Sequence, residues 1–467
     1  MVKKKIIIMK IGGSCLTEAA SLNKILKIMD MYKDANIVFV ASGFSGVTDN
    51  LIEVAKLADK KDEIYKEKMK ALKTLHDNIN SSIFKDQVIN LENTSDYINT
   101  CMRRLEEMCE QISDYGLEKF RLDFVMSFGE KLSTFIMSEF FTSKGFDSTY
   151  IPADQLVVTD DRFGNALPLM DFTLRKVKRQ IVPIISRDAF PCVTGFIGIT
   201  KEGYTTTLGR GGSDFTATIL GAMIADLFPD AEVKVILWKN VDGILSTSPE
   251  YVDAPKLLEK LSYAEAKEIA YFGAKVLHPK CISPLEAHKV TLEIRNFDKP
   301  LGSKYTLINV EGDSSKIVKG ISILKNVALL TAKSSGLVAI PGTLAKLFSV
   351  LGENHINVSL VSQSSSEVNT TLCVSQDDAQ KALDVLKNSS MFDEWYEFTL
   401  AEDIVVISVI GSVSKSGLTH QVFEKLDEQN IEIIAIAQSA DGLNISLVIK
   451  EGLEKKAISA IHTSHIF

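Results

Sequence analysis

Short apolar runs alternate with helical segments over the first 300 or so residues, and this alternation restricts the possible folds more than any other feature of the chain. Alternating strands and helices are typical of a parallel sheet that is covered by helices. Five apolar runs are expected to be strands: residues 6–10, 37–41, 149–151, 181–185 and 233–238. We therefore predict an α/β fold for this part of the chain.

Helical spacing of apolar residues marks two further segments. Residues 51–116 are rich in Lys, Glu, Leu and Ile at this spacing, and residues 124–141 form a second strong helical pattern. Within the first segment, residues 59–96 are expected to be a mobile, solvated helical excursion from the domain.

A duplicated pattern begins after residue 307. Residues 356–374 align without a gap on residues 431–449, an offset of 75, and the alignment matches Gln363 with Gln438. Each copy reads strand, polar turn, strand, and follows a predicted helix. Such a duplication is typical of paired small α+β modules. The predicted domains are residues 1–305, 306–398 and 399–467.

The charge and the cysteine pattern exclude several classes of protein. A net charge of −8 argues against general nucleic-acid binding, which needs a basic surface. No apolar stretch approaches the roughly 20 residues that cross a membrane. The six cysteines form no Cys-x-x-Cys pair and the histidines show no zinc-ligand spacing, so we expect a reducing, cytoplasmic setting and no protein metal site.

Three glycine-bearing loops follow predicted strands and carry charged side chains. Such loops can bring backbone N–H groups close to phosphate oxygens. None is a Walker A sequence or a G-x-G-x-x-G fingerprint, so neither a P-loop NTPase nor a Rossmann dehydrogenase is supported. The loops are KIGGS at 10–14, ASGFSGVT at 41–48 and TTLGRGGSD at 206–214.

Together with MSFGEKLS, GFIG, WKNVDGI and LSYAEAKEIAYFGAKVLHP, these loops resemble the motifs of the aspartokinase family, above all the kinase half of the bifunctional aspartokinase-homoserine dehydrogenases. VSQSSSE and IAIAQS extend the resemblance through the C-terminal half. It implies an amino-acid-kinase fold followed by two ACT modules. The implied reaction converts ATP and L-aspartate to ADP and 4-phospho-L-aspartate, the first step of lysine, threonine and methionine biosynthesis, with Mg2+ as the counterion of ATP.

The resemblance also implies roles for individual residues. Lys10 neutralises charge at the phosphates and Asp214 holds the catalytic groups in position. The substrate-binding candidates are Ser42, Thr48, Glu130, Arg210 and Ser213, with Arg210 suited to a bidentate grip on the α-carboxylate and Glu130 to the ammonium. The ATP-binding candidates are Gly12, Gly13, Ser14, Lys239, Asn240, Leu245 and Lys275.

Without the resemblance, plainer interpretations of the same residues hold. Glu130 and Lys131 would form a solvated helix face, and Arg210 would be a surface-loop cation. His278 is expected to be a packed or hydrogen-bonded histidine, and Trp238 a core residue at a strand end.

The segment 238–250 departs from the family pattern. Lys239 stands where threonine is usual, Asn240 and Ser248 where aspartates are usual, and Glu250 where a cation is common. A carboxylate near a polyphosphate weakens binding unless Mg2+ or Lys239 compensates, so we predict activity with weak ATP affinity. The departures leave open a catalytically weakened, amino-acid-binding regulatory subunit. A kinase acting on glutamate is a second rival, but such enzymes lack the duplicated modules.

The paired modules predict feedback regulation by an amino acid, threonine first and lysine second. Gln363 and Gln438 would then lie in or near the effector pockets, although both could instead cap hairpin turns. Modules of this kind pair across subunits through sheet edges, so we expect a homodimer or homotetramer. No nucleotide-binding βαβ unit follows the second repeat, so we expect either a monofunctional enzyme or a piece of a longer protein.

Overall fold

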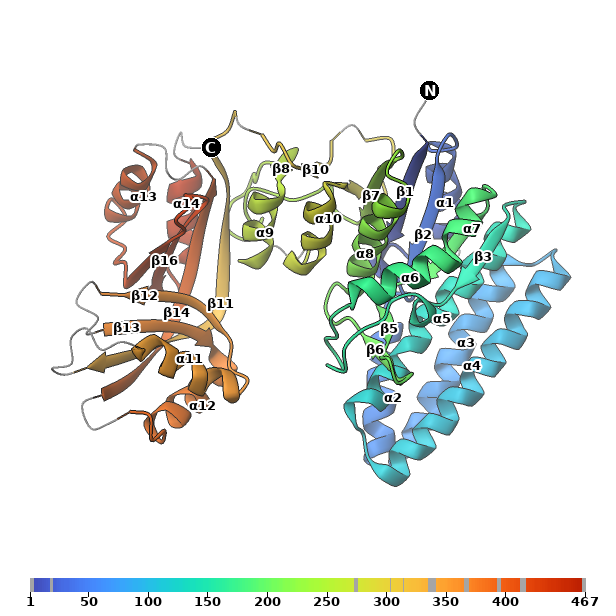
Figure 1. Ribbon diagram of the computed structural model, residues 1–467, viewed down its shortest axis with the longest axis horizontal. Helices are drawn as coiled ribbons and strands as arrows, with labels where there is room; N and C mark the ends of the chain where they lie inside the picture. The colour runs from blue at the N-terminus through green and yellow to red at the C-terminus, as the bar shows by residue number, and fades with distance from the viewer. Residues whose placement is uncertain are drawn as a thin grey trace. The chain divides into compact units, whose positions relative to one another are not determined.

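The computed structural model describes the chain in two compact units (Figure 1). The first comprises Met1–Ile244 and Val276–Val310, and the second comprises Leu245–Lys275 and Glu311–Phe467. The described residues are 4–16, 20–272, 276–302, 304–313, 315–334, 342–364, 369–392, 396–411 and 417–463.

A mainly parallel sheet forms the centre of the first unit, in the strand order β3-β4-β2-β1-β7-β9-β10. Neighbouring strands run parallel except at the β9–β10 pair. From its second residue onward, β1 is buried, as expected for a strand covered on both faces. The strands are β1 (Lys5–Ile11), β2 (Asn36–Ala41), β3 (Ser148–Ile151), β4 (Phe190–Thr194), β7 (Glu232–Lys239), β9 (Thr291–Asn296) and β10 (Thr306–Asn309).

Helices surround this sheet, and α5 (Lys119–Ser143) is buried along most of its length. The predicted helical segments 51–116 and 124–141 are thereby confirmed. The other elements are η1 (Gly13–Cys15), α1 (Ala20–Asp30), α2 (Val47–Asp59), α3 (Ile64–Ile83), α4 (Val88–Tyr115), η2 (Ala153–Gln155), α6 (Met170–Gln180), α7 (Val182–Ser186), β5 (Ile197–Ile199), β6 (Thr205–Thr207), α8 (Gly212–Leu227), η3 (Pro279–Cys281) and α10 (Ser283–His288).

The strand predicted at residues 181–185 is wrong, because these residues form helix α7. Pro183 lies in the first turn of α7, where a missing N–H leaves no intrahelical hydrogen bond unmade. The strand comes later, at β4, although this strand contains Pro191. Pairing of β4 with β2 begins only at Cys192, so the proline sits near the strand start, where its missing N–H is tolerated.

The expectation that residues 59–96 form a solvated excursion is also wrong. Helix α3 packs against both α2 and α4, which also contact each other, and it buries one face. Tyr65, Met69, Leu72 and Ile79 recur at helical spacing on that face and join the same hydrophobic core as residues of β1 and β2. The Lys and Glu side chains of α3 are exposed or half-buried and lie off that face.

The second unit contains an antiparallel sheet in the order β12-β13-β11-β14-β16-β15. The predicted repeat is confirmed in its register: Gln363 pairs with Thr370, and Gln438 pairs with Ile445, again 75 residues further on. The elements are β8 (Lys260–Ser262), α9 (Tyr263–Tyr271), β11 (Val318–Ser334), α11 (Thr343–Glu353), β12 (Val358–Gln363), β13 (Asn369–Ser375), α12 (Gln376–Lys387), β14 (Tyr396–Gly411), α13 (Leu418–Asp427), β15 (Ala435–Gln438), β16 (Asn444–Lys450) and α14 (Glu454–Thr463).

The two modules of this sheet share the long strands β11 and β14. In β14, Phe398 packs into the core under α11 and α12, whereas Val405 and Val409 pack into the core under α13 and α14. The predicted module boundary at residue 398 therefore falls inside a continuous strand. The division into three domains stays a prediction.

Helix α9 belongs to the second unit although it precedes the repeat in the chain. A capping box between Ser262 and Glu265 fixes its start. The Asn444 side-chain amide donates a hydrogen bond to Glu268, and Phe272 packs into a core with residues of β11, β13, β14 and β16. None of the helices in the described ranges has the length and apolar content that crossing a membrane requires.

Candidate active site

The candidate residues lie where parallel strands end. Ile11 of β1 pairs with Trp238 of β7, so Lys10 and Lys239 stand at the carboxyl ends of neighbouring strands. Ser42 directly follows β2, the strand on the other side of β1. Carboxyl ends of parallel strands share one edge of the sheet, which is where ligands bind in open α/β folds.

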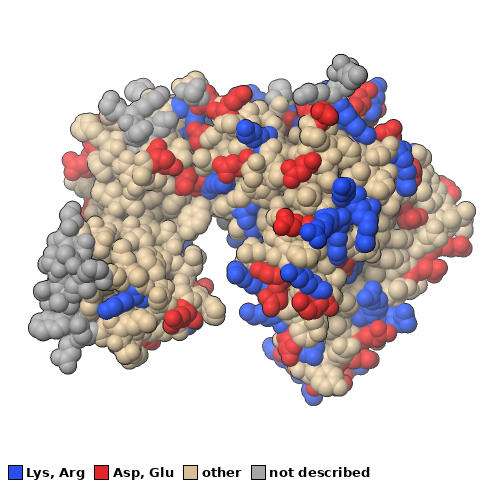
Figure 2. Space-filling view, in the orientation of Figure 1, with Lys and Arg blue, Asp and Glu red and all other residues tan. Residues whose placement is uncertain are grey.

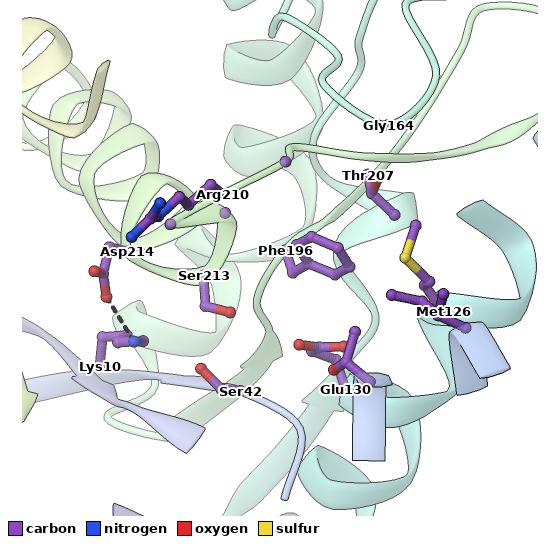
Figure 3. Close-up of a pocket in the computed structure, with 15 residues that line it drawn as sticks. Lys10, Ser42, Met126, Glu130, Gly164, Phe196, Thr207, Arg210, Ser213 and Asp214 are labelled. Carbon is purple, nitrogen blue, oxygen red and sulfur yellow. Dashed lines mark ion pairs between the residues drawn. The ribbon is translucent and has the colours of Figure 1, made fainter. Parts of the chain in front are cut away.

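A cavity of about 410 Å³ opens at this edge (Figure 3). It is lined by every residue that the sequence assigns to catalysis and substrate binding: Lys10, Ser42, Thr48, Glu130, Arg210, Ser213 and Asp214. Sequence reasoning missed further lining residues, namely Ile52, Met126, Gly164, Phe196 and Thr207. Three of them lie in motifs that were available as signals: Phe196 in GFIG, Met126 in MSFGEKLS and Thr207 in TTLGRGGSD.

Asp214 bridges two lysines at the floor of the cavity. Its two carboxylate oxygens lie 2.6 Å from the Lys10 Nζ and 2.6 Å from the Lys239 Nζ. Burial alone would raise the pKa of Asp214, but the two ion pairs outweigh it and hold the pKa at about 2. Burial lowers the pKa of Lys10, and the Asp214 carboxylate opposes this shift. The cluster therefore carries one net positive charge in a water-poor site.

The N-terminus of α8 also faces the cavity. Gly211 caps the helix at φ +71°, a left-handed conformation that favours glycine, and Ser213 and Asp214 lie in the first turn. Gly195 permits this approach, because a Cβ there would lie 2.5 Å from the Ser213 Cβ. Free N–H groups at a helix start attract anions, so the helix adds to the positive potential of the site.

Glu130 is a buried carboxylate on α5, 4% exposed, and one of its oxygens has no hydrogen-bond partner among the described residues. Burial raises the pKa of Glu130 to about 7, against the opposing effects of the Gly43 N–H and of Lys10. One helix turn further on, Ser133 Oγ donates to the Ser42 carbonyl at 2.8 Å and fixes the loop after β2 to α5. Glu130 also lines the cavity, and a carboxylate with an unused acceptor suits a cationic ligand group.

The interpretation of Glu130 and Lys131 as a solvated helix face is wrong, whereas the expectations for His278 and Trp238 are confirmed. Lys131 is 7% exposed and pairs with Asp154 at 2.8 Å, so it does not belong to a solvated face. Arg210 is exposed, as a surface-loop cation would be, yet its loop lines the cavity. His278 Nδ1 accepts a hydrogen bond from the Lys280 N–H at 3.2 Å, and Trp238 is fully buried, as predicted.

The cations of the cavity contrast with the outer surface of the first unit. Acidic and basic side chains are interspersed on the visible face, with a group of basic side chains over α6 (Figure 2). Arg175, Lys178 and Arg179 are exposed on that helix and do not line the cavity. At the cavity, Lys10 is buried, Lys239 is partly buried and Arg210 is exposed, on a protein whose net charge is −8.

The residues predicted to bind ATP are not gathered in one place, as the catalytic and substrate-binding candidates are. The Gly12 N–H donates to the Trp238 carbonyl at 3.2 Å, which joins the turn after β1 to β7, next to the cavity. Lys239 reaches the site through Asp214, and Asn240 is exposed at the end of β7. Leu245 lies in the second unit, in an isolated bridge with Leu257. Lys275 lies outside the described residues, and the ATP roles of Gly12, Gly13, Ser14, Lys239, Asn240, Leu245 and Lys275 stay predictions.

The described residues offer no metal-binding cluster of three or more His, Cys, Asp or Glu side chains. At the cavity floor, both oxygens of Asp214 are engaged by lysines. These residues therefore do not fit a dedicated Mg2+ site, and no chemical step is assigned to a metal held by the protein.

Comparison with known families agrees with this geometry. The amino acid kinase family model matches residues 5–296, and an ACT domain model matches residues 330–389 and 407–464. The first match covers more than half of the chain, so this chain belongs to the amino acid kinase family. The predicted fold class, an amino-acid-kinase fold followed by ACT modules, is confirmed.

Individual relatives extend the comparison. The chain is 29% identical over 98% of its length to the bifunctional aspartokinase/homoserine dehydrogenase of Haemophilus influenzae, covering 56% of that protein. It is also 29% identical over 98% of its length to aspartokinase 1, chloroplastic, of Arabidopsis thaliana, covering 79% of it. The chain spans about half the length of the bifunctional relatives that it matches.

Two solved structures share the fold. E. coli aspartokinase III in complex with aspartate and ADP superposes with a TM-score of 0.84 at 24% identity, covering 99% of this chain and 100% of that one. The same enzyme in complex with lysine and aspartate gives a TM-score of 0.74 at 25% identity, covering 98% and 99%.

Removing the carboxylate between the two lysines should destabilise the first unit. We expect Asp214→Ala to lower the free energy of unfolding by about 3 kcal/mol, because it leaves two close, largely buried ammonium groups without a counterion. Urea unfolding followed by Trp238 fluorescence, in a Trp395→Phe background that removes the other tryptophan, measures this change. Arg210→Ala, which truncates an exposed side chain, should change it by less than about 0.5 kcal/mol. Equal effects of the two substitutions would contradict the buried ion-pair assignment.

Proposed function

We propose that this chain is an aspartate kinase, which transfers the γ-phosphoryl group of ATP to the side-chain carboxylate of L-aspartate. The observation that carries the proposal is the single cavity shared by all seven residues that the aspartokinase motifs place in catalysis and substrate binding. The names of the relatives and the aspartate and ADP bound to E. coli aspartokinase III support it.

The lining of the cavity includes suitable partners for the two charged groups on the α-carbon of L-aspartate. Arg210 suits the α-carboxylate, because its planar guanidinium can form two parallel hydrogen bonds. The unpartnered oxygen of Glu130 suits the α-ammonium group. Thr48 and Ser213 add hydroxyl groups, and Ser42 lines the same space. The remaining carboxylate of the substrate is then free to act as the nucleophile.

The chemistry requires charge neutralisation more than proton transfer. A carboxylate with an ordinary pKa near 4 is already ionised at neutral pH, so no general base is needed. Asp214 remains ionised and is occupied by two lysines, which excludes a role as a base. Its role is to hold Lys10 and Lys239 where they offset the charge that spreads over the transferring phosphoryl oxygens. Mg2+ would arrive with ATP and add to this neutralisation.

The rival functions have less support. A purely regulatory subunit would not require Lys10, Arg210 and Asp214 to meet in one cavity. A kinase for glutamate would not account for the two ACT matches. Weak ATP affinity, caused by Glu250, and a cytoplasmic location stay predictions.

Trapping the acyl phosphate tests the activity. With hydroxylamine present, we expect purified protein to form aspartyl hydroxamate from ATP and L-aspartate. Arg210→Ala should raise the KM for aspartate by about 30-fold or more and the KM for ATP by less than about threefold, because a charged hydrogen bond contributes about 2 kcal/mol. Arg179→Ala, on the basic surface of α6, is the matched control and should leave both values unchanged. Absence of hydroxamate and of aspartate-dependent ADP release would refute the proposal.

The raised pKa of Glu130 predicts a pH dependence of aspartate binding. Only the ionised carboxylate can pair with the substrate ammonium, and with a pKa of about 7 its ionised fraction falls about tenfold between pH 8 and pH 6. We therefore expect the Kd for L-aspartate, measured by calorimetry without ATP, to rise about tenfold over this range. Glu130→Gln should bind weakly at both values. A Kd that is constant between pH 8 and pH 6 in the wild-type protein would contradict the role given to Glu130.

We propose further that an amino acid, threonine first and lysine second, regulates the kinase through the ACT modules. Gln363 and Gln438 occupy equivalent, exposed positions on β12 and β15, the two edge strands of one sheet. These edges approach each other, since Ser362 Oγ donates to the Ile436 carbonyl at 2.9 Å. Exposed Val361 and Ile436 on the same strands support a homodimer or homotetramer formed through the modules. The lysine bound to E. coli aspartokinase III supports an amino-acid effector.

Effector titration tests this regulation. Threonine or lysine at millimolar levels should inhibit hydroxamate formation, and Gln438→Ala should raise the inhibitory concentration about tenfold or more by removing a hydrogen-bonding amide. Gln421→Ala, an exposed change on α13, should leave inhibition unchanged. If neither amino acid slows the reaction, the feedback proposal is wrong, while the kinase proposal stands on the hydroxamate assay.

A further inference from the structure

Asp123 is a buried carboxylate to which neither the sequence motifs nor the reaction assigns a role. It lies on α5, seven residues before Glu130, and is 1% exposed. Its Oδ2 accepts hydrogen bonds from the N–H groups of Gly164 and Thr207, each at 2.8 Å. Its Oδ1 accepts a third from Thr207 Oγ at 2.9 Å. All three donors are neutral.

Both donor residues belong to the wall of the cavity. Gly164 and Thr207 line it, one from the loop of residues 160–167 and the other from the end of β6. The Thr207 carbonyl accepts the Ala166 N–H at 2.9 Å, so the loop and the strand are also joined directly. One carboxylate therefore fastens two separate wall segments to the helix that carries Glu130.

Thr207 stands three residues before Arg210, at the start of the loop that leads to α8. Its N–H, hydroxyl and carbonyl groups are all hydrogen-bonded. The next residue, Leu208, is held by a different segment, because the Lys280 side chain donates a hydrogen bond to the Leu208 carbonyl. Arg210, by contrast, is exposed, and its position depends on where this loop begins.

The free-energy cost of burying the Asp123 carboxylate argues against a residue that only fills space in the core. Burial of a carboxylate without a cation is costly, and burial raises the pKa of Asp123 although its hydrogen bonds to Gly164 and Thr207 oppose the shift. The cost is offset only because three donors converge on one group. Without the Asp123 carboxylate, two buried or partly buried N–H groups, those of Thr207 and Gly164, would both lose their acceptor.

We infer that Asp123 is a positioning residue that fixes the cavity wall so that Arg210 meets the α-carboxylate of the substrate. This inference rests on the proposed aspartate kinase activity. Asp123 acts through Thr207 and touches neither substrate nor nucleotide.

Three substitutions test the inference by steady-state kinetics. Asp123→Ala should raise the KM for L-aspartate by about tenfold or more, with the KM for ATP changed by less than about threefold. Asp123→Asn should stay within about threefold of the wild type, because its amide oxygen can accept both N–H bonds while its NH2 donates to Thr207 Oγ. Thr207→Val, which loses only the hydroxyl bond, should fall between them. If Asp123→Ala fails to fold, the Thr207→Val effect decides the question.

A double-mutant cycle separates positioning from general destabilisation. In an Arg210→Ala background, Asp123→Ala or Thr207→Val should raise the KM for aspartate by less than about twofold, because the residue through which they act is gone. Inhibition by β-alanine, which lacks the α-carboxylate, should be little changed by the same substitutions. Additive effects with Arg210→Ala, or equal losses for aspartate and β-alanine, would overturn the inference.

Asp160→Ala is the matched control. Asp160 also accepts two backbone N–H bonds within the 160–167 loop, from Arg162 at 3.3 Å and Leu167 at 2.9 Å, but among the described residues its carboxylate makes no hydrogen bond to β6. It should leave the KM for aspartate within about twofold. A change as large as that of Asp123→Ala would refute the specific role of Asp123. Failure of the wild-type protein to make hydroxamate would instead refute the proposed function itself.

Discussion

The arrangement of the first unit depends on one carboxylate, Asp214, held between the ammonium groups of Lys10 and Lys239. The three residues come from the ends of two parallel strands and the first turn of α8, so the ion pairs tie these elements together at the sheet edge. Two cations this close repel each other strongly in a buried site. The shared carboxylate lets both persist, and the positive α8 N-terminus lies beside them. The same interaction that stabilises the edge therefore prepares it for anionic ligands.

The positions of the buried charges along the cavity favour one orientation of a bound ligand. Glu130 lies on α5, whereas the lysines and the start of α8 lie at the strand ends. One side of the cavity therefore presents a carboxylate and the other lies beside cations. Under the proposed function, this asymmetry would favour one orientation of L-aspartate, with its ammonium group toward Glu130 and its reacting carboxylate toward the cations.

The structure brings the seven catalytic and substrate-binding candidates to one cavity, because most of them follow a strand or open a helix and the strand ends of a parallel sheet converge, while Glu130 comes from the middle of α5. The sequence-based description of two segments was wrong, because their composition suggested one structure and their packing produces another. Residues 181–185 read as a strand, yet Pro183 suits the first helical turn, and the true strand β4 includes Pro191. The lysines of α3 concealed its buried face. Asp123 had no local signal, because its contact with Thr207 spans 84 positions of the chain. The nucleotide contacts remain predictions, Lys275 among them.

The sharing of β11 and β14 has a consequence for the regulatory half. Each strand contributes side chains to the cores of both modules, so a change of twist or shear in one module is carried by covalent backbone into the other. The two equivalent hairpins are therefore mechanically coupled through the strands that they share. Binding of the proposed amino-acid effector at one hairpin would therefore alter the affinity of the other.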